Sequence, residues 1–242
     1  MKQELKIIEY KKQNKTSFLD LLFEGFSNIY SSNYLAFQLA KRDVSAQYRQ
    51  SLLGLLWSFV MPLSTAFLWI FLRGSNTVTL ADTGMNYALY VFIGTMAWAI
   101  ITESIMGPIN GTLNMRGTLS KINFPKEALI VSSVYKTLFN TGIKLIILVA
   151  MLFYFKQTIH FSILLFPFSL LVILLFGTAF GLLITPIGLL YGDVSRLLAP
   201  LFQVLMYLTP VVFAMPTKTG GIFNSLLVLN PLTPLVNNFR NT

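Results

Sequence analysis

Long apolar segments dominate the chain and leave few folds open to it. Five of them are continuous, at about 51–72, 86–108, 128–155, 162–190 and 195–216. A helix rises about 1.5 Å per residue, so roughly 20 apolar residues cross the hydrocarbon core of a bilayer. The apolar residues run without alternation, which disfavours a β-barrel. The pattern therefore predicts an all-α polytopic membrane protein with five visible spans.

The charged residues predict how the spans are oriented. Lys and Arg gather in residues 1–50 and in the segment 114–128, whereas the loops of the opposite side carry few. Loops rich in Lys and Arg stay in the cytoplasm, so we expect the N-terminus there. The net charge of +9 then reflects topology, and we expect no nucleic-acid partner. Two parts are predicted, a cytoplasmic N-terminal segment 1–50 and a transmembrane domain 51–242.

The stretch before the first span has helical periodicity. At 100° per residue its apolar side holds Phe18, Leu19, Leu22, Phe23, Phe26, Ile29 and Tyr30, and its polar side holds Asp20, Glu24, Ser27, Asn28 and Ser31. Such an amphipathic helix is predicted to lie in the membrane interface rather than to cross it. Packing against a cytoplasmic partner protein is the alternative.

The third span carries a polar stripe. Ser133, Lys136, Asn140 and Lys144 lie within an arc of about 100° and cover about 12 Å of helix. Charged groups at membrane depth are costly, so they face protein or water. We expect Glu103 of the second span to form an ion pair with Lys136, and Lys144 to lie on an aqueous path.

The fourth and fifth spans carry residues that shape membrane helices. Gly177 and Gly181, and then Gly188 and Gly192, follow the Gly-x-x-x-Gly spacing that lets helix backbones approach closely. We expect these glycines to pack against another helix. Prolines in the fifth span, Pro200 and Pro210 among them, are expected to bend or break it.

Two spans have faces that mix aromatic and polar side chains. These faces hold Trp57, Met61, Ser64 and Leu68 on the first span, and Pro200, Gln203, Tyr207, Pro210 and Ala214 on the fifth. Aromatic rings and hydroxyl groups together suit a path for sugars, because they offer flat surfaces and hydrogen bonds. Ordinary helix packing explains the same faces equally well.

The sequence holds no recognisable machinery for bond making. It lacks the G-x-x-x-x-G-K-[ST] pattern that cradles phosphates, so ATP hydrolysis would belong to a separate chain. It has no cysteine and one histidine, which leaves little for a metal site. The acids beyond residue 43 are widely separated. We expect transport, with no catalytic residue, no metal and no cofactor bound by this chain.

The segment 114–128 joins the second and third spans. It holds basic residues and a Phe-Pro break, and Pro125 can open the helix that follows. A short, stiff element in this place suits the transmission of force from a soluble partner. A plain basic loop is the alternative.

Several short motifs follow one another between about residues 40 and 240. They are Arg42-Asp43, Tyr48-Arg49-x-Ser51-x-x-Gly54-x-x-Trp57 with Pro62, Asn123-Phe124-Pro125, Asp193-Val194-Ser195-Arg196 and Asn230-Pro231-Leu232-Thr233-Pro234. In these motifs the chain resembles the permease subunit of bacterial ABC exporters for polysaccharides and polyol phosphates. That family includes exporters of O-antigen, teichoic acid and capsule.

The resemblance implies partners and a location. We expect a homodimer in the bacterial inner membrane, bound to two copies of an ABC ATPase subunit that holds ATP and Mg²⁺. The cargo would be a lipid-linked polysaccharide, moved outward past membrane lipids. An ABC permease for a drug or other small molecule is the alternative, and a membrane enzyme of glycan assembly is a third possibility.

The resemblance also assigns roles to residues. The conduit would be lined by Trp57, Met61, Ser64, Gln203, Tyr207 and Lys144; the ATPase would couple through Arg116, Lys121, Phe124 and Pro125; a re-entrant element at the outer mouth would hold Asn230, Pro231 and Pro234. Arg42, Tyr48 and Arg49 would lie at the substrate entrance, since guanidinium groups suit phosphate oxygens. The alternative is that both arginines only anchor their helix at the lipid surface.

The family has a sixth span and a cytoplasmic C-terminus. This sequence stops at Thr242, where that span would begin. The expectation is either a truncated sequence or a five-span variant.

Overall fold

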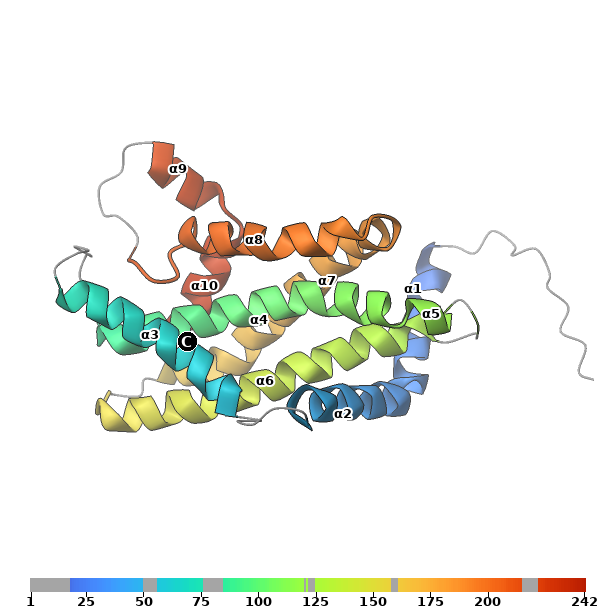
Figure 1. Cartoon of the computed structure of the whole chain (residues 1–242), viewed down its shortest axis with the longest axis horizontal. Coiled ribbons are helices and arrows are strands. Elements are labelled where there is room, and N and C mark those ends of the chain that lie inside the picture. Colours follow the sequence, from blue (N-terminus) through green and yellow to red (C-terminus); the bar gives the residue numbers. More distant parts are fainter. Residues whose placement is uncertain are drawn as a thin grey trace, which may run out of the picture.

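The computed structural model is mostly helical, and the part of the chain that it describes holds no strand (Figure 1). That part comprises residues 18–49, 56–75, 85–119, 121, 125–157, 161–214 and 222–242. Within helices, the side chains of a few residues, Met61 among them, also lie outside the description. The predicted fold class is confirmed as all-α.

Helix α4, Tyr87–Asn114, forms the centre of the molecule. Helix α6, Lys126–Tyr154, and helix α7, Phe166–Leu190, pack along it, and the short 3-10 helix η2, Phe161–Leu165, precedes α7. These three long helices are apolar and long enough to cross a membrane, with Phe161–Leu190 taken as one segment. Within an apolar stretch of 18 residues taken from each segment, the buried share is 67% in α4, 33% in α6 and 17% in Phe161–Leu190. The outer helices therefore keep apolar faces free for lipid.

Glycines bring α4 and α7 into close contact. A Cβ atom at Gly181 would collide with the backbone carbonyl of Ile105, and one at Gly177 would collide with Ser104. A Cβ at Gly188 would lie 3.3 Å from Ile109, whereas Gly192 faces open space. The predicted packing role of the first Gly-x-x-x-Gly pair is confirmed, and the prediction for Gly192 is wrong because α7 ends before it at Leu190.

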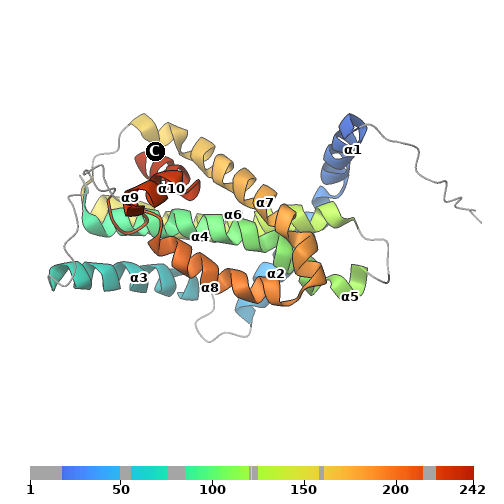
Figure 2. The same ribbon diagram turned by 90° about the horizontal axis from the view of Figure 1, so that it is seen from above.

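Helix α3, Trp57–Gly74, and helix α8, Asp193–Tyr207, lie on one side of α4. Figures 1 and 2 show that α3, α4, α6, α7 and α8 run in alternating directions between two distinct ends. One end holds α2, Asn33–Arg49, and the four-residue α5, Arg116–Leu119; the other holds α9, Ile222–Leu229, and α10, Leu232–Asn241. This alternation agrees with five passes, although α3 and α8 are shorter than the three long segments, and the count of five stays a prediction.

The N-terminal stretch forms two helices instead of one. Helix α1, Phe18–Ser31, and helix α2, Asn33–Arg49, are separated at Ser32, whose hydroxyl donates to the Asn28 carbonyl at 2.6 Å. On α1, Phe23 is 74% exposed and Tyr30 is 86% exposed, so the described part of the chain leaves these two apolar side chains largely uncovered. The interfacial placement of α1 stays a prediction.

Helix α2 is anchored on the first turns of α6. Ala36 and Leu39 pack with Ala128 and Leu129 in a small apolar cluster, separate from the main core around α4. This contact holds the charged end of α2 beside the α4–α6 pair. It thereby brings the polar residues 41–49 close to the two cavities described next.

Candidate functional site

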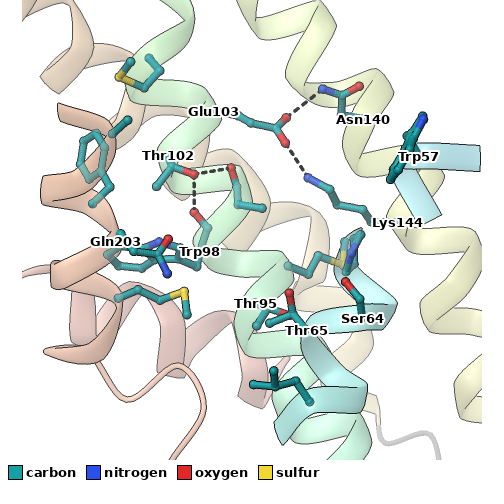
Figure 3. Close-up of a pocket in the computed structure, with 18 of the residues that line it drawn as sticks. Trp57, Ser64, Thr65, Thr95, Trp98, Thr102, Glu103, Asn140, Lys144 and Gln203 are labelled. Carbon is teal, nitrogen blue, oxygen red and sulfur yellow. Dashed lines mark hydrogen bonds and ion pairs between the residues drawn. The ribbon is translucent and has the colours of Figure 1, made fainter. Parts of the chain in front are cut away.

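A cavity with a volume of about 950 Å³ lies between α3, α4 and α8. All three tryptophans of the chain, Trp57, Trp69 and Trp98, line it. We call it the aromatic cavity. Its side walls come from the helices that carried the predicted mixed faces, and Figure 3 shows Trp57 and Trp98 on opposite sides of the space.

Small polar side chains lie among the tryptophans. Thr95 and Thr102 donate their hydroxyl hydrogens to carbonyls of their own helix, at 2.9 and 3.0 Å, so their oxygen lone pairs remain available to the cavity. Gln203 donates to the Tyr207 hydroxyl at 3.4 Å. A wall of indole rings, hydroxyls and one amide suits weak binding of a neutral polyhydroxylated molecule.

One charged cluster closes the α6 side of this cavity. The Lys144 ammonium lies 2.6 Å from the Glu103 carboxylate, and the Asn140 amide donates to the other carboxylate oxygen at 3.1 Å (Figure 3). The Lys144 side chain is 8% exposed and that of Glu103 is 32% exposed. The carboxylate is therefore the more accessible member, and the two charges cancel in the cavity wall.

The prediction that Glu103 pairs with Lys136 is wrong. Side chains on a helix lean toward its N-terminus, and α4 and α6 run in opposite directions. Glu103 therefore leans toward the C-terminal part of α6, where Lys144 leans back to meet it. Lys136 leans the other way, and the pair diverges. Lys144 lines the aromatic cavity with its charge compensated by Glu103, and its place on an aqueous path stays a prediction.

A second cavity lies between α2, α4 and α6, with a volume of about 450 Å³. We call it the polar chamber, and its polar lining is Arg42, Asp43, Gln47, Glu103, Asn110, Asn114, Ser132, Ser133, Lys136, Thr137 and Asn140. Gln47, Glu103 and Asn140 line both cavities, so the Glu103 cluster forms the boundary between them.

The structure separates the three residues expected at the substrate entrance. Arg42 lines the polar chamber and forms an ion pair with Asp43 at 2.7 Å. Tyr48 lines the aromatic cavity. Arg49 is exposed at the end of α2 and lines neither cavity.

The residues expected along the conduit come together. Trp57, Ser64, Gln203, Tyr207 and Lys144 all line the aromatic cavity, although they come from three helices. The side chain of Met61 lies outside the described residues. Trp57 and Tyr207 are each 48% exposed, and the conduit role of these residues stays a prediction.

A buried arginine anchors the opposite end of the molecule. Arg240 of α10 donates to the carbonyls of Pro210 and Val211, at 3.1 and 2.7 Å, and to the Tyr90 hydroxyl at 2.7 Å, and its guanidinium lies 3.6 Å above the Tyr90 ring. A Cβ at Gly94 would collide with Arg240 and with the Val211 carbonyl, so this glycine makes room for both. Burial lowers the pKa of Arg240, and its contact with Tyr90 opposes that shift. The sequence patterns did not single out Arg240, because its partners lie far away in the chain.

The backbone after α8 is irregular, yet its carbonyls have donors. The Tyr87 and Tyr90 hydroxyls donate to Val212 and Phe213, at 3.1 and 2.9 Å. The Asn230 amide donates to the Leu208 carbonyl at 3.1 Å. Irregular backbone at membrane depth is tolerated where protein groups satisfy it, so α8 can end at Tyr207 and not at 216 as predicted.

The predicted outer element consists of two short helices. Asn230 lies between α9 and α10, and its side-chain oxygen accepts from the Leu232 amide at 2.9 Å. Pro231 precedes the first residue of α10, and Pro234 lies in its first turn. The three residues predicted to form the re-entrant element therefore lie together at the start of α10, and their re-entrant placement stays a prediction.

The residues expected to contact an ATPase lie at the other end. Arg116 and Lys121 are exposed, the former on α5, and Pro125 precedes the first residue of α6. Phe124 lies outside the described residues. Among the residues that the structure does describe, no three His, Asp or Glu side chains gather to hold a metal ion.

Comparison with known proteins places this architecture in a family. Residues 34–242 match the model of the ABC-2 type transporter family. The chain belongs to the ABC-2 type transporter family. The region that matches begins in α2 and contains both cavities and α10, so these features lie within the family domain of this ABC-2 chain.

Relatives of this ABC-2 chain carry informative names. The O-antigen export system permease protein RfbA of Myxococcus xanthus is 26% identical over 213 residues, which are 88% of this chain and 81% of that protein. Two proteins of Klebsiella pneumoniae with the same name are each 21% identical over 84% of this chain and 77% of their own length.

Proposed function

We propose that this chain is the permease subunit of an ATP-driven exporter that moves a lipid-linked polysaccharide, of O-antigen or teichoic-acid type, out across the bacterial inner membrane. The observation that carries the proposal is the aromatic cavity, in which all three tryptophans meet hydroxyl and amide groups. The similarity to RfbA proteins named as O-antigen export permeases supports the same cargo.

The lining of the aromatic cavity suits a moving glycan. Flat indole faces pack against the apolar faces of sugar rings, and threonine and tyrosine oxygens accept hydrogen bonds from sugar hydroxyls. A conduit must hold its cargo weakly at many places, as conduction requires binding that is favourable enough to enter and weak enough to leave. Because Glu103 and Lys144 cancel each other, a neutral glycan meets no net charge in this wall.

The two ends of the molecule take opposite sides of the membrane in this proposal. The end with α1, α2 and α5 faces the cytoplasm, since the chain concentrates Lys and Arg there. Helices α9 and α10 then lie at the outer mouth, and α1 lies along the inner membrane surface through its exposed apolar residues.

Energy comes from a partner in this account. Two permease chains form a homodimer and bind two ABC ATPase subunits, which hold ATP and Mg²⁺. Arg116, Lys121, Phe124 and Pro125 contact the ATPase. Helix α5 supports this assignment, because Met115, which precedes it, and Leu119, its last residue, pack against the same apolar cluster as α2. Movement of the ATPase against α5 would thereby reach the polar chamber.

Export is tested in a bacterial strain that lacks its own O-antigen permease and expresses this chain with its partner ATPase. Wild-type chain restores polysaccharide at the cell surface, and the Trp57→Ala variant loses most of it while lipid-linked polysaccharide accumulates inside. Phe67→Ala is the matched control, because Phe67 lies on the same helix, is 69% exposed and does not line the cavity. Efflux of small hydrophobic compounds with no effect on polysaccharide would overturn the proposal in favour of a small-molecule exporter.

A further inference from the structure

The polar chamber differs in chemistry from the aromatic cavity beside it. It contains no tryptophan, and amide, hydroxyl and charged side chains from α2, α4 and α6 line it. Asn110 and Asn114 are four residues apart on α4 and so share one face. Ser132 and Ser133 face the chamber from α6. This lining is rich in hydrogen-bond donors.

The charges around the chamber do not cancel. Asp43 is neutralised by Arg42, and Glu103 by Lys144 from the far side of the boundary. Lys136 remains, and within the described part of the chain no carboxylate forms an ion pair with it. A half-buried ammonium is costly unless water or an anion accompanies it.

Further donors lie around this cation. Arg42 binds Asp43 through Nε and Nη2, and its remaining Nη1 group has donor capacity left. The Asn110 and Asn114 amides each offer two N–H groups. The Ser133 and Thr137 hydroxyls already donate to carbonyls of α6, so the amide and guanidinium N–H groups are the donors that count. A cation with N–H donors beside it is the arrangement that recognises phosphate oxygens.

We propose that the polar chamber is a binding site for a phosphate or diphosphate ester, with Lys136 as its main cation and Arg42, Asn110 and Asn114 as hydrogen-bond donors. The assignment of the ester to a lipid-linked polysaccharide rests on the proposed function; the anion site itself rests on the geometry of α2, α4 and α6. This site differs from the substrate entrance predicted at Arg42, Tyr48 and Arg49, because Arg49 lies outside the chamber.

The boundary between the two cavities gives this site a direction. Glu103 lines both spaces, whereas Lys144 lines only the aromatic cavity, so their ion pair is neutral overall but presents its carboxylate end to the polar chamber and disfavours a phosphate at the boundary. An anion is therefore held on the α2 side, while a neutral sugar chain is free to enter the aromatic cavity. The two ends of one substrate are sorted by charge.

The test measures binding to the full chain in nanodiscs of phosphatidylcholine, without ATPase. The probe is a radiolabelled polyprenyl diphosphate, and inorganic diphosphate is the competitor. Lys136→Met should weaken probe binding about tenfold or more, because a charge-assisted hydrogen bond is lost. Lys136→Arg should retain most of the affinity. Lys126→Met is the matched control, since it removes the same charge from an exposed position on the same helix and should bind the probe as the parent does.

Each outcome is decisive. Competition by inorganic diphosphate at similar concentration identifies a free anion as a sufficient ligand, and its failure to compete identifies a lipid headgroup; both support the site. Equal binding by Lys136→Met and parent overturns the site, as does an equal loss in the Lys126→Met control.

If Lys136→Met does not elute as a folded chain, Asn114→Leu should weaken binding severalfold in its place, and unchanged binding by a folded Asn114→Leu then overturns the site. Lys136-dependent binding by a chain that fails to export polysaccharide would contradict the proposed function and leave the anion site standing.

Discussion

Replacement of Arg240 by methionine should destabilise the end of the molecule that holds α10. The guanidinium donates to the Pro210 and Val211 carbonyls, which both belong to the irregular segment after α8. Loss of a donor to a buried carbonyl costs about 1–3 kcal/mol per group. Loss of the desolvated cation–π contact with Tyr90 adds about 2 kcal/mol.

A compensating term lowers the expected total. Burial of a charge carries a desolvation penalty of several kcal/mol, which the methionine variant does not have. Methionine also keeps part of the apolar contact of the arginine stem. The expected net loss is about 2–4 kcal/mol in the free energy of unfolding, since removal of one partner from a buried charged network is strongly destabilising.

The assay is reversible unfolding of the purified chain in mixed micelles with increasing SDS, followed by circular dichroism. Arg196→Met is the matched control, because Arg196 is 84% exposed in its ion pair with Asp193 and such pairs contribute roughly 0–1 kcal/mol. Arg240→Lys should lie between parent and Arg240→Met, because one ammonium does not reach both carbonyls. Unfolding of Arg240→Met within the error of the parent would refute the anchoring role.

Other substitutions probe the remaining contacts in the same unfolding assay. Gly181→Val should lose about 1–3 kcal/mol, because its Cβ collides with the Ile105 carbonyl, whereas Gly142→Ala, in open space, should gain about 0.5–1 kcal/mol. A stable Gly181→Val variant would mean that α4 and α7 pack otherwise. Glu103→Gln should lose about 1–3 kcal/mol, less than a fully buried pair since Glu103 is 32% exposed, and Lys144→Met should lose less on the Glu103→Gln background than on the parent. Additive losses in that cycle would argue against the ion pair.

Much of the fold follows from local patterns. Continuous apolar runs predict α4, α6 and α7, and the Gly177 and Gly181 spacing predicts a close helix contact that the structure confirms. These features depend on neighbours along one helix, so a single sequence carries them. The same holds for Trp57 and Ser64, which share a face of α3 and line one cavity.

The remaining features depend on how helices meet. The partner of Glu103 is decided by the relative direction of α4 and α6, which a polar stripe on one helix does not contain. Arg240 meets Tyr90 across 150 positions of the chain. The end of α8 at Tyr207 depends on donors from α4 and α10. Such features appear only when distant segments are brought together.

The central claim is that a polysaccharide passes through the aromatic cavity. It is tested most directly by filling that cavity in the complex reconstituted with its ATPase and measuring ATP-dependent transfer of lipid-linked polysaccharide into proteoliposomes. Ala99→Trp places an indole in the cavity, and Ala150→Trp places the same side chain on an exposed face of α6. The account predicts that Ala99→Trp abolishes transfer while Ala150→Trp transfers at the parent rate; undiminished transfer by a folded Ala99→Trp complex would contradict it.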